Sequence, residues 1–401
     1  MPDGMILWDE ALRLVLSHTP APGKEQTELF NSYGLVLSED VRSDMDIPPF
    51  CKAAMDGYAV RATDCGSPPV TLPVRMTLPA GVSPDRELAP GEAAKIMTGA
   101  PVPYGADSVV MVEHTRSLED GKVEILKEVT AGRNICRKGE DVARGETVLK
   151  KHTGIGAPEV AILASVGRAS VPVFRRPSVS ILSTGSEIVE PGKPLAAGKI
   201  RNSNGAMLAG MAEALGCEIR YLGIAGDKHE ELSHKVEEGL KSDVFLLSGG
   251  VSMGEFDLVP EILEKAQARR VFHRVFVKPG KPLLFARSER TIVFGVPGNP
   301  VSNFTTFHLF VKPALMKLMG HTECTPKMTE AVSETDFENR SKRVHVVPAF
   351  CTLKGAGVYA RLFTLNGSAD ITGCAGANCF CMLEPGRELV NRGDTVRLFF
   401  L

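Results

Sequence analysis

The chain has almost no net charge and no long apolar run. Its 401 residues include 46 lysines and arginines against 48 aspartates and glutamates, which gives a formal net charge of −2. This balance excludes the basic surface of a general nucleic-acid-binding protein, although it allows a local anion site. No apolar run approaches the roughly 20 residues that span a bilayer, and residues 1–10 lack the pattern of a signal peptide. We therefore expect a chain with no membrane contact and no nucleic-acid partner.

The sequence also lacks a cysteine pattern that would hold a metal. It contains nine cysteines, an odd number, and they are scattered without any Cys-x-x-Cys pair. The pair Cys379 and Cys381 is too closely spaced for the usual zinc site. Reduced thiols are the simplest interpretation, and with no signal peptide they predict a cytoplasmic protein.

The length corresponds to about 2–3 domains, and the hydrophobic pattern changes along the chain. Helices are expected within residues 5–17, 23–32 and 157–164, and short apolar segments separated by Pro, Gly and Asp-rich turns lie between the last two. From residue 178 strands alternate with helices, which predicts an α/β fold with a parallel-type sheet covered on both faces. The predicted domains are a discontinuous N-terminal linker or dimerisation domain (1–45 with 142–177), a β-rich insert (46–141), an α/β domain (178–322) and a C-terminal β domain (323–401).

Loops rich in glycine, hydroxyl and charged residues follow the predicted strands of the α/β domain. Ligands of an open parallel sheet bind beyond the carboxyl ends of its strands, so these loops are expected at one edge. Small residues let backbone N–H groups approach an anion, lysines neutralise its charge, and carboxylates suit Mg²⁺. The sequence therefore predicts a site for a phosphate-bearing anion with metal-assisted chemistry. The residues concerned are Glu187, Asp227, Ser248, Gly249, Gly250, Asp257, Lys278, Lys281, Pro297 and Pro300.

Each of these loops alone has a plainer interpretation. The segment 248–250 is also an ordinary turn, 278–281 is also a solvated turn, and Asp257 suits the start of a helix. In the β-rich insert, the segments around Asp56 and Thr98 have turn-forming composition. Only the placement of several such loops at successive strand ends favours the anion site.

Five of these segments, taken in order, resemble the molybdopterin molybdenumtransferases, the family that includes bacterial MoeA and the E domains of gephyrin and Cnx1. The resemblance covers essentially the whole chain. The matching segments are Met55-Asp56-Gly57-Tyr58-Ala59-Val60, Met97-Thr98-Gly99-Ala100-Pro101, Ser248-Gly249-Gly250-Val251-Ser252, Lys278-Pro279-Gly280-Lys281-Pro282 and Pro297-Gly298-Asn299-Pro300-Val301-Ser302.

The resemblance implies an enzyme that inserts molybdenum from molybdate into adenylated molybdopterin, with Mg²⁺-dependent release of AMP. It implies an elongated four-domain subunit whose α/β domain is similar to MogA, the adenylyltransferase that acts one step earlier. It also implies a homodimer with the active cleft between the α/β domain of one subunit and the β-rich insert of the other. A transient contact with the adenylyltransferase is a further expectation.

The resemblance also implies roles for individual residues. Glu187, Asp227 and Asp257 would shape the Mg²⁺ and pyrophosphate region, and the segment 248–250 would cradle phosphate or the pterin. Lys278, Lys281 and Ser302 would hold molybdate, with Pro297 and Pro300 beside them. Residues contributed by the partner subunit and by the C-terminal domain would complete the cleft. The former are Asp56, Thr98 and Asp141, and the latter are Arg343 and Ser368.

One segment departs from the family pattern. Where the family has Asn-Ile-Arg before Gly-Glu-Asp, this chain has Asn134-Ile135-Cys136, and Arg137 follows. A shift of one residue in a strand turns a side chain to the opposite face, so the basic contact expected from this segment is in doubt. We interpret Cys136 as a neutral replacement.

Two other functions are compatible with parts of the sequence. A scaffold comparable to the gephyrin E domain would need partner-binding features, and the chain shows no additional domain or long linker. A molybdopterin adenylyltransferase would need only the α/β domain, so the β-rich insert and the C-terminal domain disfavour it. The sequence leaves open whether tungstate replaces molybdate.

Overall fold

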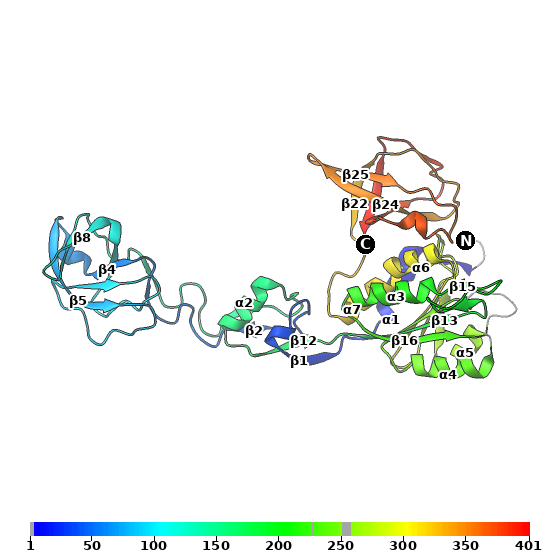
Figure 1. The fold of residues 1–401 in the computed structure, drawn as a ribbon, viewed down its shortest axis with the longest axis horizontal. Helices are drawn as coiled ribbons and strands as arrows, with labels where there is room; N and C mark the ends of the chain where they lie inside the picture. The colour runs from blue at the N-terminus through cyan, green and yellow to red at the C-terminus, as the bar shows by residue number, and fades with distance from the viewer. Residues whose placement is uncertain (1–3, 227, 251–257) are drawn as a thin grey trace. The chain divides into compact units, whose positions relative to one another are not determined.

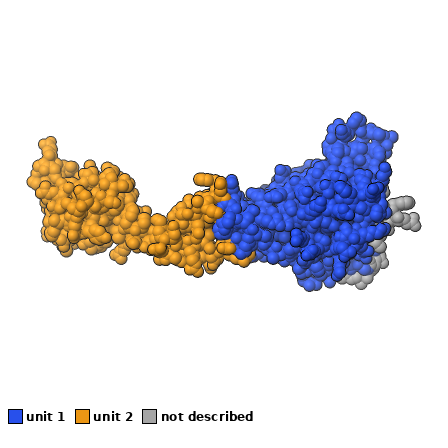
Figure 2. All heavy atoms as spheres, turned by 90° about the horizontal axis from the view of Figure 1, so that it is seen from below, with its two compact units in different colours: residues 1–27, 31–38, 172–401 blue, residues 28–30, 39–171 orange. Residues whose placement is uncertain are grey.

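The computed structural model describes residues 4–226, 228–250 and 258–401. The chain forms two compact units, which Figure 2 colours separately. The first unit contains residues 1–27, 31–38 and 172–401, and the second contains residues 28–30 and 39–171. Each unit is described by itself below.

The first unit is built on a six-stranded mixed sheet in the order β16-β13-β17-β21-β20-β18. The first four of these strands are parallel, and the last two run antiparallel to their neighbours. The central strands are continuous apolar segments because both of their faces are covered. The strands are β13 (Ser178–Thr184), β16 (Glu218–Ala225), β17 (Val244–Ser248), β18 (Arg269–His273), β20 (Leu284–Arg287) and β21 (Ile292–Val296).

Helices cover both faces of this sheet, as the alternating pattern predicts (Figure 1). One face packs against α1, α3, α6 and α7, and the other packs against α4 and α5, in two separate apolar clusters. A π-helical turn, η5, separates α6 from α7. The helices are α1 (Trp8–His18), α3 (Ser203–Ala214), α4 (His229–Gly239), α5 (Val259–Lys265), α6 (Pro300–Thr306), η5 (Phe307–Val311) and α7 (Lys312–Leu318).

A closed β barrel forms the C-terminal part of the first unit. Its strands follow the order β24-β25-β22-β28-β26, and β24 also pairs with β26, which closes the barrel. Phe380 and Phe399 of the barrel lie in the same apolar cluster as the sheet and α1, so the barrel and the α/β part share a core. The barrel strands are β22 (Met328–Ser333), β24 (Val344–Lys354), β25 (Gly357–Leu362), β26 (Cys379–Leu383) and β28 (Thr395–Phe400). Two short strands, β23 (Phe337–Glu338) and β27 (Leu389–Val390), pair with each other in a separate sheet.

The apolar pattern of residues 271–277 predicts one strand of the α/β sheet, but the structure divides this segment between two sheets. The sheet strand β18 ends at His273, and a separate short strand, β19 (Val277–Lys278), pairs in parallel with β24 of the barrel. We call residues 278–282 the lysine loop. Because it begins at the end of β19, it lies beside the barrel and not at a strand end of the α/β sheet. An apolar pattern indicates only that Val275 and Val277 are buried, as they are. It does not indicate which sheet buries them.

The second unit contains a six-stranded sheet in the order β7-β4-β6-β5-β9-β8. The first residue of β4 is Gly57. This position requires glycine because a Cβ there would lie 1.8 Å from the carbonyl oxygen of Val110 on β7. The helix expected at 157–164 is confirmed as α2 (Ala157–Ser165). The sheet strands are β4 (Gly57–Val60), β5 (Val70–Leu78), β6 (Ala93–Ile96), β7 (Ser108–Met111), β8 (Thr115–Ser117) and β9 (Lys122–Ile125).

The helix expected within 23–32 is wrong. Residues Lys24–Glu28 form strand β1, which pairs with β12 (Ser170–Phe174), and Leu29–Asn31 form a 3₁₀ turn, η2. The segment Lys-Glu-Gln-Thr-Glu has no apolar face to hold a helix against a core, so backbone pairing with β12 determines its structure. The other short elements are β2 (Val41–Arg42), β3 (Lys52–Ala53), η3 (Ala62–Cys65), η4 (Val112–His114), β10 (Ile135–Cys136), β11 (Thr147–Leu149), β14 (Ile188–Val189), β15 (Ile200–Arg201) and η6 (Thr372–Cys374).

The nine cysteines are free thiols in the structure. Within the described part of the chain, no helix is both long and apolar enough to cross a lipid bilayer.

Candidate active site

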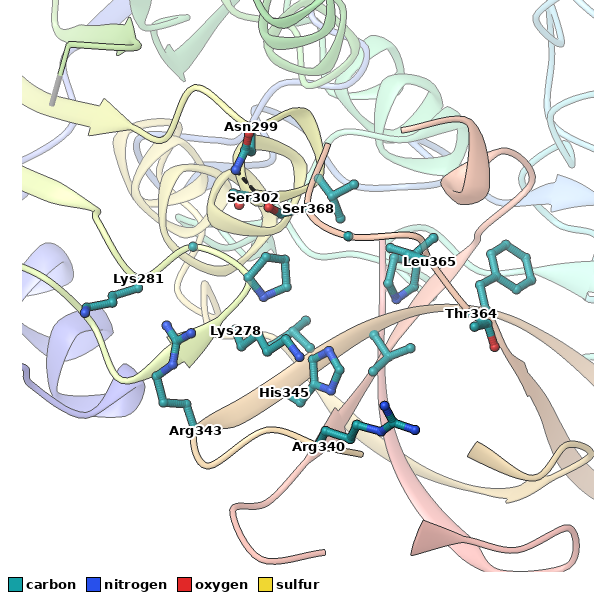
Figure 3. A pocket seen from close by; sticks show the side chains of 18 of the residues that line it. Lys278, Lys281, Asn299, Ser302, Arg340, Arg343, His345, Thr364, Leu365 and Ser368 are labelled. Carbon is teal, nitrogen blue, oxygen red and sulfur yellow. Dashed lines mark hydrogen bonds between the residues drawn. The ribbon is translucent and has the colours of Figure 1, made fainter. Parts of the chain in front are cut away.

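The lysine loop borders a pocket of about 700 Å³ between the α/β sheet and the barrel of the first unit (Figure 3). We call this cavity the lysine pocket. Three elements supply its polar side chains: the loop after β19, the start of α6 and the barrel with its loop at 363–368. The residues that matter below are Lys278, Lys281, Asn299, Ser302, Arg340, Arg343, His345 and Ser368.

The lysine pocket carries an excess of positive charge. Among the described residues, no carboxylate forms an ion pair with Lys278 or Lys281. Arg340 is different because its guanidinium is paired with Glu338 at 2.6 Å. Arg343 donates to the backbone carbonyl of Val277 at 2.7 Å, and burial lowers its pKa. The two free ammonium groups are therefore available to an anion in the pocket.

Ser302 and Ser368 enter the pocket from the start of α6 and from the barrel loop. Ser302 is buried in the first turn of α6. The side-chain amide of Asn299 donates to the hydroxyl of Ser368 at 2.8 Å, and the N–H of Val301 donates to the Ser368 carbonyl at 3.0 Å (Figure 3). These bonds fix the barrel loop against α6. Lys278, Lys281, Ser302, Arg343 and Ser368, predicted separately, are thus brought to one cavity.

His345 is a residue of this pocket that the sequence analysis missed. It stands opposite Lys278 in the pairing of β24 with β19, and its Nδ1 lies 2.9 Å from Oδ1 of Asn339. Burial, together with the charges of Lys278 and Arg343, lowers the pKa of His345 to about 4. No local pattern marks His345, because its place in the pocket comes from the pairing of β24 with β19.

A second pocket, of about 600 Å³, adjoins the first. We call it the glycine-loop pocket. Pro282, Pro297 and Asn299 line both cavities, and Pro300 lines only the second. Its remaining wall comes from the strand ends of the α/β sheet and from α3. The polar and glycine residues of this wall are Thr184, Gly185, Glu187, Arg201, Asn202, Ser203, Asn204, Ser248, Gly249, Gly250 and Gly298.

The glycines of this second pocket are required by their surroundings. Gly249 and Gly250 have φ of +91° and +64°, and a Cβ on them would lie 2.5 Å and 2.7 Å from the backbone oxygen and the Oγ1 of Thr184. Ser248 is buried, and its hydroxyl accepts bonds from the amides of Asn204 at 2.9 Å and Asn303 at 3.0 Å. This loop is therefore closely held against neighbouring backbone, which suits a ligand approached by main-chain atoms.

Only one of the three candidate metal carboxylates can be placed. Glu187 is exposed and lines the glycine-loop pocket, with its carboxylate 2.5 Å from where a Cβ of Gly185 would stand. Asp227 and Asp257 lie outside the described residues. Within the described residues, no group of three or more His, Cys, Asp or Glu side chains could hold a metal ion.

Asp56, Thr98 and Asp141 belong to the second unit. The Asp56 carboxylate accepts bonds from the N–H and the hydroxyl of Thr98, both at 2.7 Å, and these bonds lower the pKa of Asp56. Asp141 is exposed, and its N–H donates to the carbonyl of Ile47 at 3.0 Å. The structure therefore joins Asp56 to Thr98 as one hydrogen-bonded pair.

The departing segment at 134–137 is also in the second unit. Cys136 lies in β10 opposite Lys52 of β3, and the N–H of Arg137 donates to the Glu140 carboxylate at 2.7 Å. Arg137 thus begins the turn after β10, so it does not occupy the strand position of Cys136.

The α/β sheet carries glycine loops at its strand ends, and the barrel joined to it adds positively charged side chains to the adjoining cavity. This arrangement is typical of a protein that binds anionic small molecules. Family models match in chain order: the MoeA N-terminal region (domain I and II) at residues 6–167, a probable molybdopterin binding domain at 180–317, and the MoeA C-terminal region (domain IV) at 330–401.

Individual relatives agree with these matches over nearly the whole chain. The molybdopterin molybdenumtransferase of Staphylococcus aureus is 36% identical over 392 residues, which are 96% of this chain and 93% of the relative. That of Bacillus subtilis is 35% identical over 401 residues, covering 98% and 93%. The crystal structure of the molybdopterin biosynthesis moeA protein from Pyrococcus horikoshii has a TM-score of 0.85 at 33% identity, covering 99% of each chain. The chain belongs to the MoeA family of molybdopterin molybdenumtransferases.

Proposed function

We propose that the protein is a molybdopterin molybdenumtransferase, an enzyme that transfers molybdenum from molybdate to adenylated molybdopterin and releases AMP. The observation that carries the proposal is the pair of adjoining pockets in a chain of this family. One pocket has the charge for an oxyanion, and its neighbour has the glycine loops for a phosphate-bearing substrate. Two reactants held side by side meet without the entropic cost of a separate encounter.

We assign molybdate to the lysine pocket. Molybdate is a tetrahedral dianion at neutral pH, and it needs cations and hydroxyl donors around its oxygens. Lys278 and Lys281 supply two charges without carboxylate partners among the described residues, and Ser302 and Ser368 supply hydroxyl groups. Arg343, which directly precedes the barrel strand β24, adds a third charge. Charge-assisted hydrogen bonds of this kind are about twice as strong as neutral ones.

We assign the adenylated molybdopterin to the glycine-loop pocket. Its anhydride would lie against the segment 248–250, which lines this pocket. Mg²⁺ would neutralise the charge that develops on the phosphate as AMP leaves. Glu187 fits this role by its chemistry and its place on the pocket wall, and Asp227 and Asp257 would complete the carboxylate set.

We further propose that the enzyme works as a homodimer in the cytoplasm. In this proposal Asp56, Thr98 and Asp141 of one subunit complete the cleft of the other. The hydrogen-bonded pair of Asp56 and Thr98 supports this, because the two groups are held together and would enter the partner's cleft as one unit. A transient contact with the molybdopterin adenylyltransferase would deliver the substrate.

The reaction itself tests the proposal. The protein is incubated with adenylated molybdopterin, Mg²⁺ and molybdate, and we expect AMP release together with formation of molybdenum cofactor. Asp257→Ala should remain folded and lose turnover. No AMP release above background would refute the proposal, and ATP consumption with unadenylated molybdopterin would indicate an adenylyltransferase instead.

A further inference from the structure

The ring of His345 is held in one orientation by Asn339. Asn339 is buried, and its amide nitrogen donates to the backbone carbonyl of Arg387 at 2.9 Å. Its Oδ1 accepts the N–H of Ser341 at 3.1 Å. These two backbone groups determine which end of the Asn339 side chain is oxygen. The Oδ1 that faces His345 can only accept, so Nδ1 of His345 must carry a hydrogen.

Nε2 is therefore the only ring nitrogen of His345 at which a proton can be gained or lost. The charged side chains facing the ring are Lys278 of β19 and Arg343, which directly precedes β24, and both oppose a positive imidazole. The residue opposite His345 on β26 is Leu383, which carries no charge, and the ring of Phe337 lies with its centroid 5.9 Å away. Without an anion the imidazole is neutral at pH 7, and Nε2 bears a lone pair.

The other charged residues of the lysine pocket do not offset this. Lys281 adds positive charge. Glu338 is paired with Arg340, and the Asp336 carboxylate accepts the N–H of Arg392 at 2.8 Å. The pocket thus presents a neutral imidazole among cations, in a cavity whose charge suits an oxyanion (Figure 3). A bound dianion reverses the electrostatic environment of the ring because it places two negative charges beside it.

We propose that His345 takes up one proton at Nε2 when a doubly charged oxyanion binds in the lysine pocket, and that the resulting imidazolium donates a hydrogen bond to that anion. With molybdate as the anion, this inference rests on the proposed function. The site then binds the dianion and a proton together. At an effective dielectric constant of about 20, two adjacent negative charges interact strongly enough to raise the pKa of an imidazole from about 4 to above 7.

The bound proton has a use in the proposed reaction. A dithiol and molybdate condense to a complex in which two sulfurs replace one oxygen, and that oxygen leaves as water with the two thiol protons. No atom is oxidised or reduced, and no further reactant is needed. The imidazolium gives its Nε2 proton to the leaving oxygen, and a thiol then returns a proton to Nε2. His345 would thus act as an acid and then a base at one nitrogen.

Proton uptake is measured directly by calorimetry. Molybdate, and sulfate as a second dianion, are titrated into the full-length protein at pH 7 in buffers of different ionisation heat. We expect close to one proton taken up per bound anion. We also expect the affinity to fall about tenfold per pH unit between pH 6 and pH 7, because binding consumes a proton. Nitrogen chemical shifts of the imidazole should change at Nε2 and remain those of a protonated nitrogen at Nδ1.

The variants separate His345 from other histidines and from simple folding effects. His345→Gln should abolish the proton uptake and flatten the pH dependence, while Lys278 and Lys281 still bind the anion. His234→Gln, an exposed histidine of α4 outside both pockets, should keep the wild-type uptake. The imidazole shifts of the wild-type protein keep the inference testable even if the His345 variant fails to fold.

Anion binding without proton uptake in the wild-type protein would overturn the inference and leave the proposed function intact. The same holds if His345→Gln takes up as many protons as the wild type. Failure of molybdate to bind, or failure of AMP release, would instead count against the proposed function.

Discussion

Replacing Lys278 by methionine tests, with a single substitution, whether the lysine pocket binds an anion. Methionine keeps an apolar chain of similar length and removes the ammonium group. Because no described carboxylate pairs with Lys278, the substitution leaves no new unpaired acid behind. A hydrogen bond to a charged group contributes about 1.5–3 kcal/mol, so the affinity for molybdate should fall by about 10- to 150-fold.

The same substitution has a second effect of known sign. The charge of Lys278 is one cause of the lowered pKa of His345, so its removal should raise that pKa above about 4. Calorimetric titration with molybdate measures the first effect, and imidazole shifts followed against pH measure the second. Lys265→Met is the matched control, because Lys265 is exposed on α5 and pairs with Glu261 at 2.6 Å.

The reasoning would be refuted by a Lys278→Met protein that binds molybdate within about twofold of the wild type, since a lost charge-assisted bond costs far more. An unchanged pKa of His345 in the same protein would show that the two side chains do not interact across the pocket.

Three further predictions concern stability. Burial lowers the pKa of His308 to about 3, so the folded state binds this proton less readily than the unfolded chain. Stability should therefore fall by up to about 1.4 kcal/mol per pH unit below about pH 6.5, and His308→Leu should remove that part of the slope in urea unfolding curves. Gly57→Ala should destabilise the second unit by more than about 2 kcal/mol in thermal unfolding, since its Cβ would lie 1.8 Å from a carbonyl oxygen. Gly66→Ala is the control and should leave the unfolding temperature unchanged, because no atom lies within 4 Å of the added Cβ. Asp243→Ala removes a carboxylate that accepts a hydrogen bond from Arg175 at 2.8 Å. Because the Arg175 side chain is 41% exposed, we expect the free energy of unfolding to fall by only about 1–3 kcal/mol. A denaturant midpoint equal to that of the wild type would contradict this prediction.

The fold class could be predicted because strong periodic patterns determine it. The short apolar segment Val70–Leu78 favours a strand and forms β5 with these bounds, and α2 ends one residue beyond the predicted helix at 157–164. The segment 24–28 was misassigned because it carries no apolar pattern, and only pairing with β12 makes it a strand. Local sequence does not report a distant strand partner.

The candidate site could be predicted in part. Lys278 and Lys281 were found from a loop that carries glycine and charge, a signal that is local in the sequence, and Ser302 came from the family resemblance. His345 was missed because its importance comes from a pairing of β24 with β19, between residues far apart in the chain. Its proton state depends further on how Asn339 is held by Ser341 and Arg387, which no linear pattern contains.

The central claim is that the lysine pocket holds the oxyanion from which the metal is transferred. A crystal structure of the protein soaked with molybdate, with data collected at the molybdenum absorption edge, locates that anion without ambiguity. The account predicts an anomalous peak between Lys278, Lys281 and Ser302, within hydrogen-bonding distance of His345. A peak elsewhere, with the lysine pocket empty, would contradict it.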